Sequence, residues 1–199
     1  DKPLQEIMPE FSDLMASALS IDPNDFECHR LQCAVNKMMG DMKSALEHGK
    51  KAYDLNPNDP RILQQYGEIL LTTGKTEEGC DLTLLALEYD PVAQGQTNSD
   101  KRKSDGVFGC VLDDRPEVGL DIASGMIDRS EKVLVYSAAL AVGSTGSLEN
   151  FSWLIDDLKD ANFEQIEEAI EEMGKFDVVV QSKLKEVFLD HILPLREVA

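Results

Sequence analysis

The chain has 199 residues, of which 42% are hydrophobic and 29% are charged, a balance typical of a globular protein with a sizeable core. Acidic residues outnumber basic residues by 38 to 19, and the formal net charge of −19 repels phosphate backbones, so we expect no direct binding of nucleic acid. No apolar run approaches the roughly 18–20 residues that a membrane span needs, and we expect a cytoplasmic protein without membrane contact.

The first predicted element is a helix in residues 8–23, with the sequence MPEFSDLMASALSIDP. In the register that superposes Pro23 on Pro57, Phe11 and Ala18 fall on Ala45 and Ala52 of a later predicted helix. No complete helix is predicted before this segment. Because the first residue is not Met, we expect a further region upstream in the full-length protein.

Two neighbouring segments then repeat each other in this same register. Pro-Asn-Asp at 23–25 recurs at 57–59, where proline cannot continue a helix and aspartate offers an N-cap oxygen to the next one. Gly40 recurs as Gly74, and a left-handed backbone at a helix end favours glycine. Each segment therefore predicts two helices joined by a short turn. The predicted spans are Phe26–Met39, Met42–Leu55, Arg61–Thr73 and Thr76–Tyr89.

The length of this repeat, about 34 residues, is that of the tetratricopeptide repeat (TPR) family. With Ala45, Ala52 and Ala86 small where helices approach closely, the sequence resembles that family. The resemblance covers residues 10–91 and implies an all-α fold: a right-handed superhelix, or α-solenoid, of TPR-like helix hairpins. At three positions a polar residue replaces the aromatic or apolar residue of the family: His29, Gln32 and Asn36. Gly79 stands where the family usually has alanine.

The resemblance also implies how the chain is divided. We expect a partial TPR, formed by a second helix alone, in residues 1–22, and complete TPRs in 23–56 and 57–90. Degenerate TPR-like hairpins are expected in 91–161 and a C-terminal helical cap in 162–199. Arrays of this degenerate kind resemble those that lie C-terminal to effector domains in some bacterial regulators and nucleotide cyclases.

Residues 92–106 are polar and are expected to form a linker or the exposed start of a helix. Their basic cluster, Lys-Arg-Lys at 101–103, leaves open a contact with a phosphate group or an acidic partner. The next segment predicts a helix, a turn at Asp113–Arg115, and a helix that starts with Pro116. A further hairpin follows, with Gly143–Gly146 as its turn.

Two helices with apolar faces are predicted at the end of the chain, where a solenoid needs an element that covers its last hydrophobic face. The first ends at Gly174, and glutamates surround its apolar stripe, which comprises Phe163, Ile166, Ile170 and Met173. The buried side of the second comprises Val180, Leu184, Val187, Phe188 and Ile192. The three valines at 178–180 leave a short strand open as an alternative.

No catalytic motif is present, because the three histidines are scattered and no nucleophile elbow, phosphate loop, dinucleotide-binding or metalloprotease signature occurs. The four cysteines contain no CxxC pair, which predicts buried thiols in a reducing compartment rather than a zinc site. The acidic clusters lack EF-hand spacing. We therefore expect no enzyme activity, no metal site and no cofactor.

The TPR resemblance implies a protein–protein interaction module that binds a protein or peptide segment in the concave groove lined by the first helices of its hairpins. The groove positions carried over from the family are Glu27, Arg30, Ala34, Lys37, Met38, Arg61, Gln64, Glu68, Leu71 and Thr72. We expect this scaffold to be part of a larger bacterial regulatory protein, with homodimerisation left open. The alternative is a structural or dimerisation segment of an enzyme, such as a nucleotide cyclase or a transferase, whose catalytic domain lies upstream.

Arg30 and Arg61 are expected to project to the same side of neighbouring hairpins, because both lie near the start of a first helix. Two guanidinium groups in that arrangement would hold an acidic peptide or a carboxylate. The alternative is that both arginines only balance nearby acids such as Glu27 and Glu68.

Overall fold

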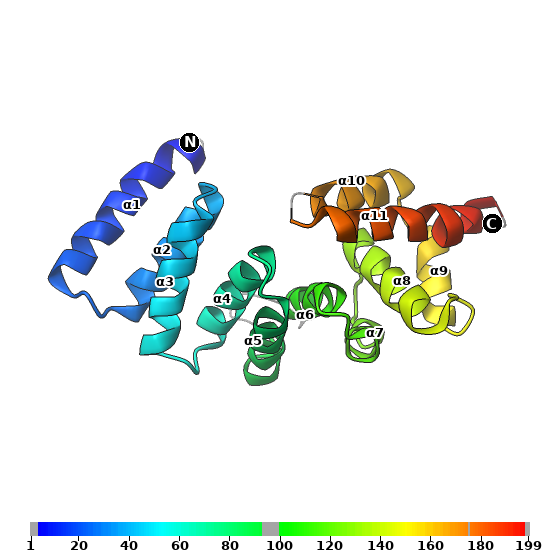
Figure 1. Ribbon diagram of the computed structural model, residues 1–199, viewed down its shortest axis with the longest axis horizontal. Coiled ribbons are helices and arrows are strands. Elements are labelled where there is room, and N and C mark those ends of the chain that lie inside the picture. The colour runs from blue at the N-terminus through cyan, green and yellow to red at the C-terminus, as the bar shows by residue number, and fades with distance from the viewer. Residues whose placement is uncertain (1–3, 93–99, 175, 198–199) are drawn as a thin grey trace. The chain divides into compact units, whose positions relative to one another are not determined.

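The computed structural model describes residues 4–92, 100–174 and 176–197. Within these ranges every regular element is a helix and no strand occurs, which confirms the all-α class. The chain divides into two compact units, residues 1–89 and 90–199 (Figure 1). The finer division into individual repeats stays a prediction.

The described residues of the first unit form five helices, and each packs against the next along the chain (Figure 1). Their bounds are Leu4–Ile21 (α1), Phe26–Met38 (α2), Met42–Leu55 (α3), Pro60–Thr72 (α4) and Thr76–Tyr89 (α5). The bounds of α3 and α5 are as predicted, and those of α2 and α4 differ by one residue at their ends. The first helix, α1, starts before the predicted segment and runs through Pro9.

Aspartate side chains cap the starts of α2 and α4. The Asp25 carboxylate accepts a hydrogen bond from the backbone N–H of Cys28 at 2.9 Å, and the Asp59 carboxylate accepts one from the N–H of Arg61 at 2.9 Å. These bonds satisfy donors that a helix start leaves unpaired. The predicted N-cap role of both residues is confirmed.

In the part of the chain that the structure describes, the same kind of backbone turn ends a helix at three places. Gly40 and Gly74 have φ angles of 79° and 85°, and after each glycine the next N–H donates to the carbonyl five residues earlier, at 2.9 Å. The same bond follows Asp114 in the second unit, where φ is 52°. Aspartate tolerates this left-handed conformation better than most residues. The turn at Asp114 is therefore built like the turns inside the first two TPR-like hairpins.

The core of the first unit continues from one hairpin to the next through α3. Leu46 of α3 packs against a cluster of buried α4 and α5 side chains and also against a second cluster around Cys33 and Ile69. Ala52 and Ala86 are both buried. Their burial confirms that small side chains lie where helices approach closely.

The helices of the second unit pack around one buried helix. These helices are Asp100–Leu112 (α6), Pro116–Ser124 (α7), Glu131–Thr145 (α8), Ser152–Asp160 (α9), Phe163–Met173 (α10) and Val178–Val187 (α11), followed by a π-helical turn at Phe188–Ile192 and a 3₁₀ turn at Leu193–Glu197. Residues 133–141 of α8 are all buried, because α6, α7, α9, α10 and α11 pack around that helix. Helices α10 and α11 lie side by side on α8 (Figure 1), which confirms a helical cap at the C-terminal end.

One prediction in the second unit is wrong, and one alternative is excluded. Residues 143–145 are not a turn, because α8 continues to Thr145 and the left-handed residue that ends it is Gly146, with φ 76°. Residues 178–180 are not a strand, because the Asp177 carboxylate caps α11 by accepting hydrogen bonds from the N–H groups of Val179 and Val180. Val180, predicted to be buried, is half-buried.

Of the two alternatives for residues 92–106, the described residues show the start of a helix rather than a linker, but this start is partly buried; residues 93–99 lie outside the described part of the chain. Helix α6 begins at Asp100, whose buried carboxylate accepts hydrogen bonds from backbone N–H groups of the loop before α8. Arg102 is buried and pairs with Asp90 at 2.9 Å, and Lys103 donates to a backbone carbonyl at the end of α7. Arg102 and Lys103 therefore form contacts within the second unit, while Lys101 is exposed, so the three residues do not form one exposed basic cluster.

Candidate partner-binding face on α2 and α4

Helices α2 and α4 contact each other and bring most of the predicted groove residues onto one face. We define the α2/α4 face by Glu27, Arg30, Lys37, Met38, Arg61, Gln64 and Glu68. Leu71 does not belong to it, which corrects the prediction. Its side chain is only 3% exposed, because it packs against α5 where Gly79 leaves room for it.

Arg30 is held by groups on both helices. Its Nη2 and Nε atoms donate to the two Glu27 carboxylate oxygens at 2.6 and 2.9 Å, and its Nη1 atom donates to Oε1 of Gln65 in α4 at 3.2 Å. The hydrogen bonds from Arg30 lower the pKa of Glu27 below its ordinary value of 4.5. Because only 14% of the Arg30 side chain is exposed, little of it remains accessible to a ligand.

Arg61 is the more accessible arginine, with 46% of its side chain exposed. Its Nη2 atom lies 2.7 Å from Asp59 Oδ2 and 3.4 Å from Glu27 Oε2. The hydrogen bond from Arg61 lowers the pKa of Asp59, and Asp59 in turn raises the pKa of Arg61. Lys37 of α2 pairs with Glu68 of α4, so an ion pair joins the two helices.

The basic groups of the α2/α4 face are thus paired with acids of the same unit. This arrangement agrees with the alternative that the arginines balance nearby acids, with Asp59 rather than Glu68 as the main partner of Arg61. A ligand carboxylate at Arg61 would have to compete with Asp59. Beside these charge pairs the face exposes one large apolar side chain, Met38. Binding at this face stays a prediction.

A buried polar layer lies behind this face and was not assigned a role from the sequence. The three polar residues that depart from the TPR pattern, His29, Gln32 and Asn36, are all buried. The Gln32 amide donates to Ser12 Oγ of α1 at 2.8 Å and to Asn36 Oδ1 at 3.2 Å. Buried polar groups need such partners, so Gln32, with Asn36 beside it, joins α1 to α2 through hydrogen bonds rather than through apolar contacts alone.

His29 and His48 form a hydrogen-bonded pair whose tautomers follow from their partners. His29 Nε2 lies 3.1 Å from the Pro23 carbonyl oxygen, which only accepts, so Nε2 carries the hydrogen. In neutral His29 the Nδ1 atom is then an acceptor. It lies 2.9 Å from Nδ1 of His48, which must therefore donate. The pair ties α3 to the loop before α2.

We expect the folded first unit to lose stability as the pH falls below 6.5, in part because of His48. Burial, followed by the neighbouring His29 ring, lowers the pKa of His48 below its ordinary value of 6.5, while Glu47 partly opposes this shift. Below pH 6.5 the unfolded chain therefore binds the proton more readily than the folded chain, and the free energy of unfolding decreases. Urea denaturation between pH 7.5 and 5.5 measures this slope.

The control is the His48→Gln variant, whose unfolding free energy should depend less steeply on pH over the same range. His191→Gln, which alters a histidine of the second unit, should retain the slope of the parent protein. Equal slopes for the parent and His48→Gln would contradict the prediction.

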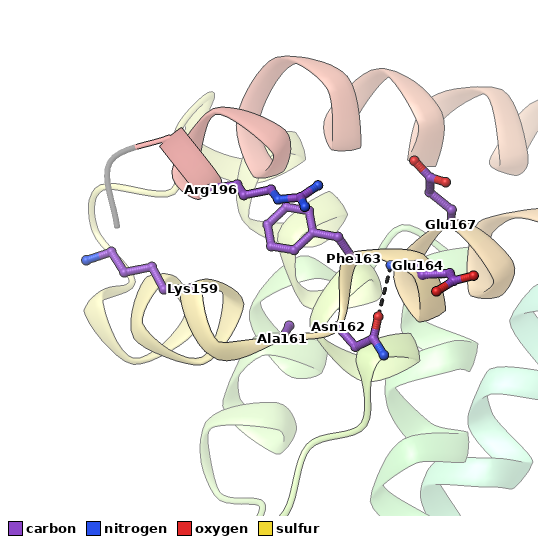
Figure 2. A pocket seen from close by; sticks show the side chains of 7 residues that line it. All are labelled: Lys159, Ala161, Asn162, Phe163, Glu164, Glu167 and Arg196. Carbon is purple, nitrogen blue, oxygen red and sulfur yellow. Dashed lines mark hydrogen bonds between the residues drawn. The ribbon is translucent and has the colours of Figure 1, made fainter.

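Figure 2 shows a cavity of about 490 Å³ in the second unit, beside the start of α10. The Arg196 guanidinium lies over the Phe163 ring, 5.5 Å from its centroid, and Asn162 Oδ1 accepts a hydrogen bond from the N–H of Glu164 at 3.0 Å. Two basic and two acidic side chains line this cavity. Because the charges are mixed, the cavity does not select a ligand of one sign.

In residues 4–92, 100–174 and 176–197, no three His, Cys, Asp or Glu side chains gather closely enough to hold a metal ion. Over the same ranges no helix has the length and apolar content needed to cross a bilayer. The side chains of Cys33, Cys80 and Cys110 are buried as predicted, whereas Cys28 is only half-buried. Burial raises the pKa of Cys33 to about 11, which disfavours the reactive thiolate.

No protein-family model and no curated protein matches the chain. Among solved structures, PilF of Pseudomonas aeruginosa, a TPR-containing protein, is similar in fold. The similarity covers 97% of this chain and 96% of the PilF chain, with a TM-score of 0.58 and 15% sequence identity. The likeness is one of fold. It agrees with an all-α array of TPR-like hairpins.

Proposed function

We propose that this chain is a protein-interaction scaffold without catalytic activity, and that its α2/α4 face binds a peptide or protein segment. The observation that carries the proposal is the placement of α2 beside α4, with polar side chains that bridge the two helices. Lys37 pairs with Glu68, and Arg30 donates to Gln65. Stacked hairpins of this kind present extended binding surfaces. The two contacts fix acidic and basic side chains of α2 and α4 relative to one another.

The chemistry of the face favours a ligand with both charges. The net charge of −19 attracts a basic partner at long range. Arg61, half exposed at the surface, offers a planar fork of donors to a carboxylate at short range. Met38 supplies an exposed apolar contact on the same face. An extended segment or a helix that carries charged and apolar side chains would satisfy these groups together.

We expect Arg61→Glu to weaken partner binding about tenfold or more, because it replaces the accessible donor with a charge of the opposite sign. The measurement is a pull-down from native lysate at fixed salt, with captured proteins quantified for the parent and the variant side by side. Circular dichroism checks that the variant is folded.

The matched control is Lys50→Glu, which makes the same change of charge on α3, where Lys50 is exposed and pairs with Asp54 at 2.7 Å. This control should retain the partners of the parent protein. If folded Arg61→Glu captures the same partners in the same amounts as the parent, the α2/α4 face is not the binding surface.

A further inference from the structure

A second cavity in the second unit lies between α7 and the segment that joins α8 to α9. Its volume is about 440 Å³, within the range of pockets that hold small ligands or side chains. It combines three kinds of group: carboxylates from α7, hydroxyls from the end of α8, and aromatic rings at the start of α9. The residues that matter here are Glu117, Asp121, Ser144, Thr145, Phe151 and Trp153.

The carboxylates of this cavity are not neutralised by the protein. Glu117 and Asp121 are one helical turn apart on α7, and both are exposed. Neither side chain forms an ion pair or a hydrogen bond with another residue in the described part of the chain. This differs from the α2/α4 face, where each acid of an ion pair already has a basic partner. Two unpaired carboxylates on one wall favour a cationic ligand.

The hydroxyl groups also favour a ligand that donates hydrogen bonds. Ser144 Oγ donates to the Ala141 carbonyl oxygen at 3.1 Å, and Thr145 Oγ1 lies 3.0 Å from that oxygen and 2.8 Å from the Ser147 carbonyl oxygen. Each hydroxyl has one hydrogen, which it donates to these carbonyl oxygens. The hydroxyl oxygens therefore have acceptor capacity left for a ligand but no hydrogen to give. Among the residues that the structure describes, no Lys, Arg or His lines the cavity, so an anion would find no basic side chain of theirs there.

The aromatic wall discriminates among cations. The Arg129 guanidinium lies over the Trp153 ring, 4.8 Å from its centroid, so this indole already stacks with one guanidinium. The same ring lines the cavity and is only half-buried, which leaves part of it accessible. Tryptophan binds cations through its ring more strongly than the other aromatic residues, and arginine is the side chain that most often stacks on such rings.

We propose that this cavity binds an arginine side chain of a basic partner segment. The guanidinium stacks on Trp153 and donates to Glu117 and Asp121, while the aliphatic stem of the arginine lies against Phe151. The net charge of −19 brings a basic segment to the chain, and the cavity selects arginine within it. The site lies in the second unit and does not depend on the α2/α4 face.

The test uses Trp153, the single tryptophan of the sequence, as an intrinsic probe. The full chain is titrated with a short acetylated and amidated peptide, Gly-Arg-Gly-Arg-Gly, while tryptophan fluorescence is recorded. We expect saturable quenching or a spectral shift with the arginine peptide and at least tenfold weaker binding of the citrulline analogue, which has the same shape without the charge. Equal binding of the two peptides would overturn the proposal.

Charge variants distinguish binding in this cavity from attraction by the net charge of the chain. The double variant Glu117→Gln with Asp121→Asn should raise the dissociation constant of the arginine peptide at least tenfold. Its matched control is Glu164→Gln with Glu168→Gln, which removes two exposed charges at the same helical spacing on α10 and should leave the constant within twofold of the parent value. Equal weakening by both double variants would show attraction by net charge alone and would overturn the site.

Discussion

Gly79→Leu is expected to lower the free energy of unfolding of the first unit by about 3 kcal/mol or more, because overpacked helix contacts cost about 1–3 kcal/mol and this one involves backbone atoms. A Cβ atom at residue 79 would lie 2.8 Å from the Gly67 carbonyl oxygen and 2.8 Å from both the backbone nitrogen and Cγ of Leu71. Real Cβ atoms do not approach so closely, so α4 and α5 would have to separate. Urea denaturation followed by circular dichroism measures the loss.

The control for this prediction is Gly143→Ala, another glycine within a helix. A Cβ atom there would meet only the end of the Lys183 side chain, at 3.7 Å. Alanine is a better helix former than glycine, so this variant should gain about 0.5–1 kcal/mol. If Gly79→Leu unfolds at the same urea concentration as the parent, α4 and α5 do not approach each other closely at Gly67 and Gly79, and the prediction is contradicted.

The same contact explains a departure from the TPR pattern. The family usually has alanine at the position of Gly79, and no neighbouring residue in the sequence accounts for the change. In the structure the backbone of α4 comes so close at Gly67 that even a methyl group has no room. The absence of a side chain at both glycines therefore permits this approach of α4 and α5.

Arg129→Met is expected to lower the free energy of unfolding of the second unit by about 2–3 kcal/mol. The Arg129 side chain is mostly buried; its Nε donates to Asp157 at 2.5 Å, and its Nη1 donates to the carbonyl oxygens of Ala123 at 3.1 Å and Met126 at 2.9 Å. Methionine keeps the length of the side chain but leaves all three acceptors without this donor. The expected loss is smaller than the roughly 3–5 kcal/mol for a fully buried ion pair because Asp157 is about one-third exposed.

Thermal or urea unfolding, followed by Trp153 fluorescence, measures this effect, since the indole stacks on Arg129. The control is Arg196→Met. Arg196 lies over the Phe163 ring near the end of the chain, and loss of an exposed contact of that kind costs about 0.5–1 kcal/mol. A loss at Arg129 no larger than the loss at Arg196 would show that its three hydrogen bonds contribute little.

The hairpins were predictable because their signals are local. Pro-Asn-Asp before a helix and glycine after it act within one helical turn, and the N-cap bonds of Asp25 and Asp59 join residues two or three positions apart. Such bonds depend little on the rest of the chain, so the bounds of α2 and α4 could be read from the sequence to within one residue. The turn predicted at Asp113–Arg115 was recognisable for the same reason, and Asp114 there has a left-handed backbone like that of Gly74.

The burial and the pairing of individual side chains were not predictable in the same way. Lys-Arg-Lys at 101–103 looks exposed in the sequence, yet Arg102 is buried against Asp90 and Lys103 reaches the end of α7. Leu71 was assigned to a groove, yet α5 covers it. For the predicted groove residues, the sequence indicated which helices carry them but not that Lys37 and Glu68, far apart in the chain, pair across the face.

By itself the sequence determined the all-α class, the helix hairpins and the small residues at their contacts, because caps, turns and periodicity act between near neighbours in the chain. The tertiary structure alone decided which polar groups are buried, which arginines remain accessible, and that Glu117 and Asp121 are left without partners beside Trp153. These properties depend on side chains brought together from distant parts of the sequence. Their energies come from burial and pairing in three dimensions, for which a single sequence carries no local signal.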